Sequence, residues 1–257
     1  MAVEFSKEAG VGFITLANPP ANSYDMAFVE ELGAAVDESA GDGEVKVVVM
    51  RSGLDRFFSA GADIKAFMAN TPDANMDMVR RAHLVLGSIA AVPKIFIASI
   101  GGHALGGGLE MALACDLRFG AEGEHRLGLP ESTLGLLPGN GGTQRLPRLI
   151  GASRALDLMV SGRTLTPAEA FQVGLLDRLV PADRLEAETA AYCETLVKGA
   201  QRAIGSIKLA VHEGVEEPLE AGMKREQELM DGLFRTQDAK EGVTAFVEKR
   251  EAQFTGN

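Results

Sequence analysis

The sequence contains few cysteines and few aromatic residues. Among 257 residues there is no tryptophan, aromatic residues make up 5 %, and the only cysteines are Cys115 and Cys193. Neither cysteine belongs to a CxxC pattern, so we expect no disulfide framework. Two isolated cysteines fit a reducing compartment, and we therefore expect a cytoplasmic protein.

Long hydrophobic runs are also missing. No apolar stretch reaches the ~20 residues that a membrane-spanning helix needs, and the run Ile95–Ile100 has the length of a buried strand. No basic segment followed by an apolar one stands at the N-terminus, so no signal peptide is expected. The four histidines are scattered, and His212 lacks a second histidine at metal-ligand spacing. We expect neither a membrane partner nor a metal site.

Basic residues are outnumbered by acidic ones. The chain has 25 Lys and Arg against 36 Asp and Glu, a formal net charge of −11. Nucleic acid binding needs a basic face, so nucleic acid is not expected as a partner. An anionic substrate would have to be held by local lysines or arginines.

Apolar residues and glycine are plentiful. They make a real core possible, and the length predicts one large domain or one domain with an appendage. Runs of strand length alternate with segments of helical spacing, which predicts a mostly parallel α/β sheet with helical crossovers. The expected strands are Val11–Leu16, Val45–Met50, Pro93–Ile100 and Leu117–Phe119. The expected helices include Phe28–Val36, Met78–Ala90 and Gly107–Ala114, with a loop at Arg56–Ala62 and a turn at Gly101–Gly106.

After about residue 142 the pattern becomes helical. Thr166 to Glu169 forms a capping box with proline in the first turn, and Gly174 stands where a helix-ending glycine belongs. Leu175–Val180 is expected to be extended, followed by three or four helices from Ala182 onward. The helices of Pro218–Phe254 have little apolar face of their own and should pack on the body or on a neighbouring subunit.

Two glycine-containing loops carry the main chemical signal. Glycine lets a backbone amide approach a ligand closely, and the first amides of a helix carry the positive end of its dipole. Gly106–Gly108 precedes a helix, and Ala60–Asp63 repeats this arrangement. Both loops are consistent with donors to an oxyanion, or alternatively with two ordinary tight turns. Gly139–Gln144 lacks the third glycine of a dinucleotide loop, so a Rossmann fold is not favoured.

Two acidic residues accompany these loops. Glu110 lies in the first turn after the glycine run, and Glu131 follows Pro130. Two carboxylates can share acid and base roles if their environments differ. The alternative is that both are ordinary first-turn acids favoured by the helix dipole.

With these motifs in place, the chain resembles the crotonase, or enoyl-CoA hydratase/isomerase, superfamily over essentially its whole length. The segments that carry the resemblance are Phe58–Lys65, His103–Glu110, Leu129–Glu131, Leu137–Leu146, Ser161–Arg163, Pro167–Ala170, Gly174–Asp177 and Glu241–Arg250. The resemblance implies a spiral of ββα turns over residues 1–195 and a helical region over 196–257 that builds homotrimers or hexamers.

The resemblance also implies roles for individual residues. The amides of Ala62 and Gly107 would hold a thioester oxygen, and Glu110 and Glu131 would be the catalytic pair. No cofactor is implied, because coenzyme A is part of the acyl-CoA substrate. The residues expected to bind this substrate are Arg56, Ala60, Asp63, Ile64, Gly139, Phe246 and Lys249.

One position departs from the family pattern. Tyr24 stands where many relatives have a small or aliphatic residue, so we expect the acyl end of the site to differ in shape. The resemblance implies an enoyl-CoA hydratase of fatty acid β-oxidation type. An enoyl-CoA isomerase, or another crotonase reaction on an acyl-CoA enolate, is the enzyme alternative. An RNA-binding relative would need a basic helix, and Met78–Ala90 offers only Arg80 and Arg81.

Overall fold

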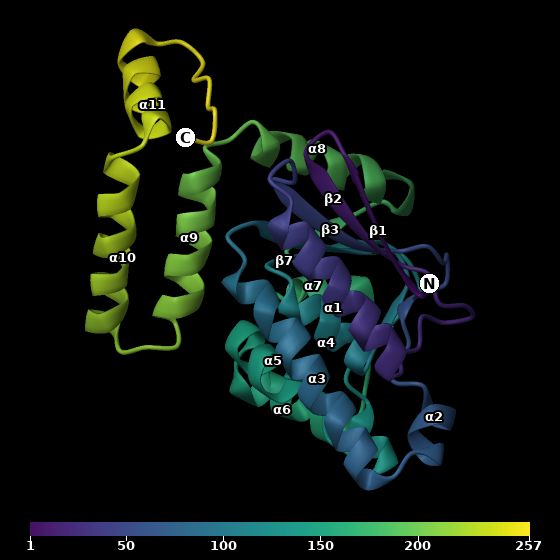
Figure 1. Cartoon of the computed structure of the whole chain (residues 1–257). Coiled ribbons are helices and arrows are strands. Elements are labelled where there is room, and N and C mark those ends of the chain that lie inside the picture. Colours follow the sequence, from purple (N-terminus) through teal and green to yellow (C-terminus); the bar gives the residue numbers. More distant parts are fainter.

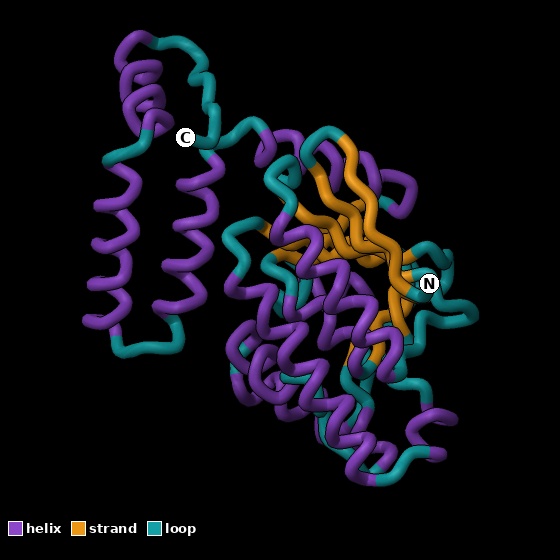
Figure 2. The backbone as a smooth tube through the Cα atoms, viewed as in Figure 1, coloured by secondary structure: helices purple, strands orange, loops and turns teal.

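The larger of two sheets organises the chain. In the computed structural model, which describes residues 1–257, its strand order is β1-β2-β3-β5-β7-β9, and only the β1–β2 pair is antiparallel. Figure 2 shows this twisted sheet beside the helices. Its strands are β1 (Val3–Glu8), β2 (Val11–Leu16), β3 (Val47–Ser52), β5 (Ile95–Ile100), β7 (Leu117–Ala121) and β9 (Arg178–Val180).

A second, parallel sheet consists of three very short strands. These are β4 (Phe57–Ser59), β6 (His103–Leu105) and β8 (Leu127–Gly128). The sequence-based expectation of a loop at 56–62 and a turn at 101–106 was therefore wrong at β4 and β6. Strands of three residues are too short to show a period of two, and a register shift interrupts the β4–β6 pairing.

Most of the remaining chain is helical. The capping box at Thr166 is confirmed in both halves, and Gly174 follows the helix end with φ +82°. The helices are α1 (Met26–Gly41), α2 (Ile64–Ala69), α3 (Pro72–Ala91), α4 (Gly107–Ala114), η1 (Glu131–Leu134), α5 (Gly142–Ile150), α6 (Ala152–Ser161), α7 (Pro167–Gln172), η2 (Ala182–Arg184), α8 (Leu185–Val197), α9 (Gln201–Gly214), α10 (Leu219–Phe234) and α11 (Gln237–Glu248).

The central strands are buried on both faces. Val48 and Met50 of β3 point into the main core with α1, α3 and α4, whereas Val47 and Val49 pack toward α8. Figure 1 shows α8 on one side of the sheet and α1 and α3 on the other. This two-sided burial explains why the strand sequences are continuously apolar rather than alternating.

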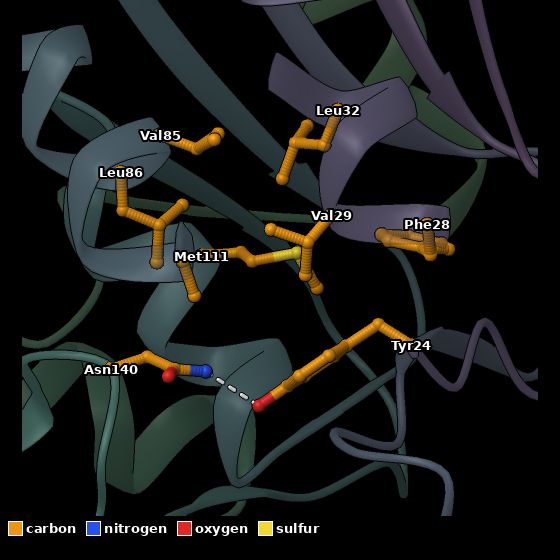
Figure 3. A pocket seen from close by; sticks show the side chains of 9 residues that line it. Tyr24, Phe28, Val29, Leu32, Val85, Leu86, Met111 and Asn140 are labelled. Carbon is orange, nitrogen blue, oxygen red and sulfur yellow. Dashed lines mark hydrogen bonds between the residues drawn. The ribbon is translucent and has the colours of Figure 1, made fainter. Parts of the chain in front are cut away.

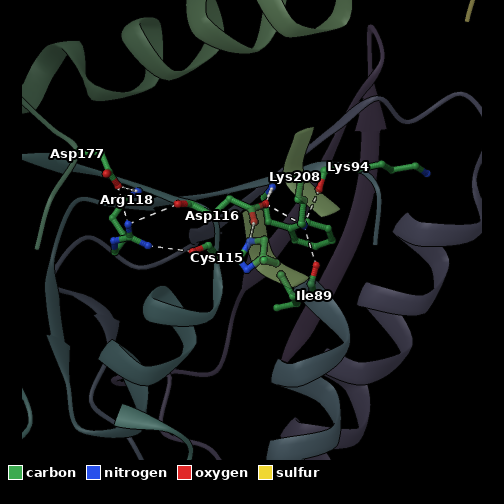
Figure 4. A network of polar contacts seen from close by, with 9 residues as sticks. Ile89, Lys94, Cys115, Asp116, Arg118, Asp177 and Lys208 are labelled. Atoms are coloured by element: carbon green, nitrogen blue, oxygen red, sulfur yellow. Dashed lines mark hydrogen bonds and ion pairs between the residues drawn. The ribbon is translucent and has the colours of Figure 1, made fainter. Parts of the chain in front are cut away.

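Helices α9, α10 and α11 extend away from the sheet (Figure 1). A buried polar network joins α9 to the body: Lys208 Nζ lies 2.9 Å from Asp116 Oδ2 and donates to the carbonyls of Ile89 and Lys94. His212 Nε2 lies 2.7 Å from the other Asp116 oxygen. Figure 4 shows Lys208 reaching between Asp116 and the end of α3. The network fixes the base of the projecting helices.

The division of the chain at residues 195 and 196 stays a prediction, and this boundary falls within the last turn of α8.

Large apolar side chains are exposed along α9 to α11. They include Ile207, Val211, Val215, Leu219, Met223, Phe234, Val243, Phe246 and Val247. None of the helices combines the length and the apolar character that crossing a membrane requires.

Candidate functional site

The two glycine-containing loops meet at the start of α4. Gly61 has φ +90°, and a Cβ atom placed on it would lie 2.9 Å from the Leu105 carbonyl oxygen and 3.2 Å from the Gly107 nitrogen. Only glycine permits this approach, because an added side chain would push the loops apart. The loop Ala60–Asp63 and the first turn of α4 therefore form one continuous backbone surface.

Two amide groups on this surface have no protein acceptor. The Gly107 N–H opens α4, where the first turn has no intrahelical partner, and neither it nor the Ala62 N–H donates a hydrogen bond within the protein. The neighbouring Asp63 N–H does donate, to the Tyr24 carbonyl at 2.8 Å. Ala62 and Gly107 thus each leave one backbone donor unpaired where the two loops meet.

Glu110 lies in the first turn of α4, three residues after Gly107. It is 1 % exposed, and its Oε1 accepts hydrogen bonds from the Asn140 and Gly142 amides, both at 2.7 Å. Burial raises the pKa of Glu110, while these two hydrogen bonds and the charge of Arg145 act in the opposite direction. The loop before α5 therefore holds one oxygen of this carboxylate in place.

Glu131 approaches the same place from η1. A Cβ atom on Gly106 would lie 2.9 Å from its Oε1, and its buried Oε2 has no hydrogen-bond partner. Burial raises the pKa of Glu131 to about 7, and the charge of Glu110 contributes to this rise. The two carboxyl groups therefore differ in environment: Glu110 is held by two amides, whereas Glu131 keeps one oxygen free.

Tyr24 and Asn140 also belong to this cluster. Asn140 Nδ2 donates to Tyr24 Oη at 2.5 Å, as Figure 3 shows. A Cβ atom on Gly107 would overlap the Tyr24 hydroxyl, so this hydroxyl lies against the start of α4. From the sequence, Tyr24 was only a departure from a family pattern and Asn140 only part of a glycine-rich loop. The only signal for Asn140 in the sequence was its position between two glycines.

Five of the expected substrate-binding residues surround the two loops or lie near them. The Ala60 N–H donates to the Ala21 carbonyl, and the Gly139 oxygen lies 2.6 Å from His83 Nε2. The Asp63 carboxylate caps α2 by accepting from the Lys65 and Ala66 amides. The remaining two, Arg56 and Ile64, have exposed side chains.

The other two expected substrate-binding residues are remote from this cluster. Phe246 lies in α11 and is 85 % exposed, and Lys249 ends that helix in a left-handed conformation. Figure 1 shows α11 at the opposite end of the molecule from α2. Within one chain, the structure does not bring Phe246 or Lys249 near Glu110.

No group of three or more His, Cys, Asp or Glu side chains is arranged to hold a metal ion.

Comparison with known proteins identifies the class to which this fold and this cluster belong. The family model described as "Enoyl-CoA hydratase/isomerase" matches residues 6–257. A "Probable enoyl-CoA hydratase" of Bacillus subtilis is 37 % identical over 262 residues, covering 99 % of both chains.

Solved structures agree with the sequence matches. A crystal structure from Geobacillus kaustophilus, named "Enoyl-CoA hydrates", has a TM-score of 0.98 and 44 % identity, covering 100 % of this chain and 97 % of the other. An enoyl-CoA hydratase structure from Bacillus anthracis has a TM-score of 0.96 and 34 % identity, with both chains fully covered. The chain belongs to the enoyl-CoA hydratase/isomerase family. The expected α/β crotonase-like fold is confirmed.

Proposed function

We propose that the protein is an enoyl-CoA hydratase, which adds water across the 2,3 double bond of a trans-2-enoyl-CoA to give a 3-hydroxyacyl-CoA. One observation carries the proposal: two glutamates in unlike environments lie beside two amides that have no protein acceptor. Hydration of a conjugated thioester needs a base for water, an acid for the α-carbon and stabilisation of the enolate oxygen.

Each residue has one task in this mechanism. The Ala62 and Gly107 amides donate to the thioester oxygen. The ionised Glu110 takes a proton from a water molecule as the water oxygen bonds to the β-carbon, and electrons of the double bond move to the thioester oxygen. The protonated Glu131 then gives its proton to the α-carbon as the carbonyl re-forms. Glu110 then releases its proton to solvent and Glu131 takes one up from solvent, so one water is added to the substrate in total.

The coenzyme A portion requires cations that the overall charge of −11 does not supply at long range. Arg56, beside the first loop, is one candidate. Lys249 is the other. Phe246 lies three residues before it, and because both residues are remote from Glu110 within one chain we assign them to the site of a neighbouring subunit. The exposed apolar residues of α9 to α11 support a homotrimer, or a hexamer made of two trimers. Ala60, Asp63, Ile64 and Gly139 would line the path of the substrate.

The direct test is incubation of the purified protein with crotonyl-CoA while following the absorbance of the conjugated enoyl thioester. We expect the absorbance to fall and 3-hydroxybutyryl-CoA to accumulate. An isomerase would instead interconvert 2-enoyl and 3-enoyl thioesters without forming a hydroxyl group. Absence of the hydroxyacyl product, with such a shift of the double bond, would overturn the hydratase proposal.

A further inference from the structure

Tyr24 is a polar side chain of the cluster to which the mechanism above gives no task. We propose that its hydroxyl is a third hydrogen-bond donor to the thioester oxygen, acting together with the Ala62 and Gly107 amides. This inference rests on the proposed function, because it assigns the residue a place around the same oxygen. Three structural features support it.

The first feature is position. The backbone of Tyr24 pairs with the first loop: its N–H donates to the Gly61 oxygen at 3.0 Å, and its carbonyl accepts from the Asp63 N–H at 2.8 Å. These two bonds flank Ala62. At the other end of the residue, the hydroxyl lies where a Cβ atom of Gly107 would be. Tyr24 therefore joins the two loops: its backbone flanks Ala62, and its hydroxyl lies against Gly107.

The second feature is the direction of hydrogen bonding. Tyr24 Oη accepts from Asn140 Nδ2, and this is the only hydrogen bond that the hydroxyl makes in the protein. Because the bond from Asn140 uses only a lone pair of the oxygen, the O–H group remains free to donate. A buried hydroxyl that does not donate loses free energy, so the arrangement favours a ligand acceptor beside Gly107.

The third feature is the protonation state. Burial raises the pKa of the Tyr24 hydroxyl, and the charges of Glu110 and Glu131 raise it further, although the Asn140 bond acts against them. The group therefore stays protonated at physiological pH. A neutral hydroxyl can donate to a developing oxyanion, whereas a phenolate would repel it.

The ring is buried in this place. Tyr24 and Asn140 close one side of a small cavity that is otherwise apolar, lined by Phe28, Val29, Leu32, Ala82, Val85, Leu86 and Met111 (Figure 3). The cavity has only about 10 Å³, room for at most one water, so an acyl chain cannot pass behind the ring. A donor fixed before the reaction needs no reorganisation as charge develops.

The test uses Tyr24→Phe, which removes the hydroxyl and keeps the ring. Loss of one oxyanion donor costs ~10²–10³-fold in kcat. With two amides still present, we expect a fall in kcat of about 10²-fold with crotonyl-CoA, and little change in KM. Tyr192→Phe is the matched control, because Tyr192 is the only other tyrosine, lies on α8 and packs against Phe119 of β7. It should leave kcat unchanged.

A second readout separates donation from a structural role. The carbonyl stretching band of [1-¹³C]butyryl-CoA, which cannot be hydrated, should move to lower frequency on binding to the wild type and move less on binding to Tyr24→Phe. This band can be measured even if crotonyl-CoA is not hydrated, so it tests Tyr24 separately from the proposed function. Asn140→Ala, which frees the hydroxyl to rotate, should give an intermediate band. Identical bands for wild type and Tyr24→Phe would overturn the proposal.

Discussion

Glu110 and Glu131 have the same side chain but different hydrogen bonds. Glu110 Oε1 accepts from two backbone amides, and Glu131 Oε2 accepts from none. A glutamine at position 110 can still accept both amide bonds through its carbonyl oxygen, so the substitution removes the charge and preserves the local structure. The matching substitution at position 131 replaces an acid that has few contacts to lose.

We therefore expect Glu110→Gln and Glu131→Gln each to lower kcat by ~10²–10⁴-fold, the usual worth of a general acid or base, with the thermal unfolding temperature nearly unchanged. Glu186→Gln is the control, because Glu186 is exposed on α8 and makes no side-chain hydrogen bond. Steady-state kinetics with crotonyl-CoA measures the effect. Turnover close to that of the wild type in either variant would exclude the two-glutamate mechanism.

The two carboxyl groups also predict a pH profile. Hydration needs Glu131 protonated, and because its pKa is about 7, kcat/KM should fall as pH rises above about 7. Hydration also needs Glu110 ionised. Because burial raises the pKa of Glu110, kcat/KM should fall at acid pH, and this fall should begin at a higher pH than the titration of an exposed glutamate. In Glu131→Gln the alkaline fall should disappear from the residual activity. An unchanged alkaline limb in that variant would assign it to another group.

At the scale of elements, the start of α4 is the point where β6, the first loop and the Tyr24 segment converge. The Gly107 amide can serve as a donor only if residue 107 itself carries no side chain that pushes the surrounding groups away. A methyl group at this position would meet the Tyr24 hydroxyl, so the ring would have to move away from the amides.

We expect Gly107→Ala to reduce kcat/KM with crotonyl-CoA by more than ~10²-fold, the cost of losing an oxyanion donor, although the substitution removes no functional group. Gly87→Ala in α3 is the control, since nothing lies within 4 Å of an added Cβ there. Alanine in an open helical position should leave activity intact and stabilise the fold by up to ~1 kcal/mol. Normal hydration by a folded Gly107→Ala protein would contradict the assignment of this amide.

The elements also show what the sequence could and could not predict. The strands β3 and β5 were predictable because burial on both faces leaves continuous apolar runs. β1 was not recognised, because only Val3 is buried in this edge strand and the other positions are largely polar. The helices with clear caps, such as α7, were predictable from local chemistry alone.

Residues of the site could be predicted only where their neighbours in the sequence pointed to them. Glu110 stands beside the glycine run that suggested it, and Glu131 follows a proline. The bond from Asn140 to Tyr24 joins residues 116 positions apart, and no local pattern reports such a contact. The same holds for the two amides that bind Glu110, which come from a loop some 30 residues away.

At the scale of the whole molecule, α9 carries the projecting helices, and its attachment depends on a buried ion pair. The Lys208 side chain is 1 % exposed and that of Asp116 is 9 % exposed. Both ions make further hydrogen bonds. Lys208 donates to two carbonyls, and Asp116 accepts from the Phe96 amide and is hydrogen-bonded to His212.

Lys208→Met should destabilise the protein by ~3–5 kcal/mol, because it leaves the Asp116 charge buried without its main partner. Lys224→Met on α10 is the control, since Lys224 is exposed and makes no ion pair, and it should change stability by less than ~0.5 kcal/mol. Denaturant unfolding at neutral pH measures both. Equal stability of the two variants would show that the network does not hold α9.

The proposed reaction is tested most directly by following its atoms. Crotonyl-CoA is incubated with the protein in H₂¹⁸O and, separately, in D₂O, and the product is analysed by mass spectrometry and NMR. We predict 3-hydroxybutyryl-CoA with ¹⁸O on C3 in the first case and a single deuterium on C2, delivered to one face, in the second. Deuterium incorporation without any ¹⁸O at C3 would mean that the site forms an enolate but does not add water, which contradicts a hydratase.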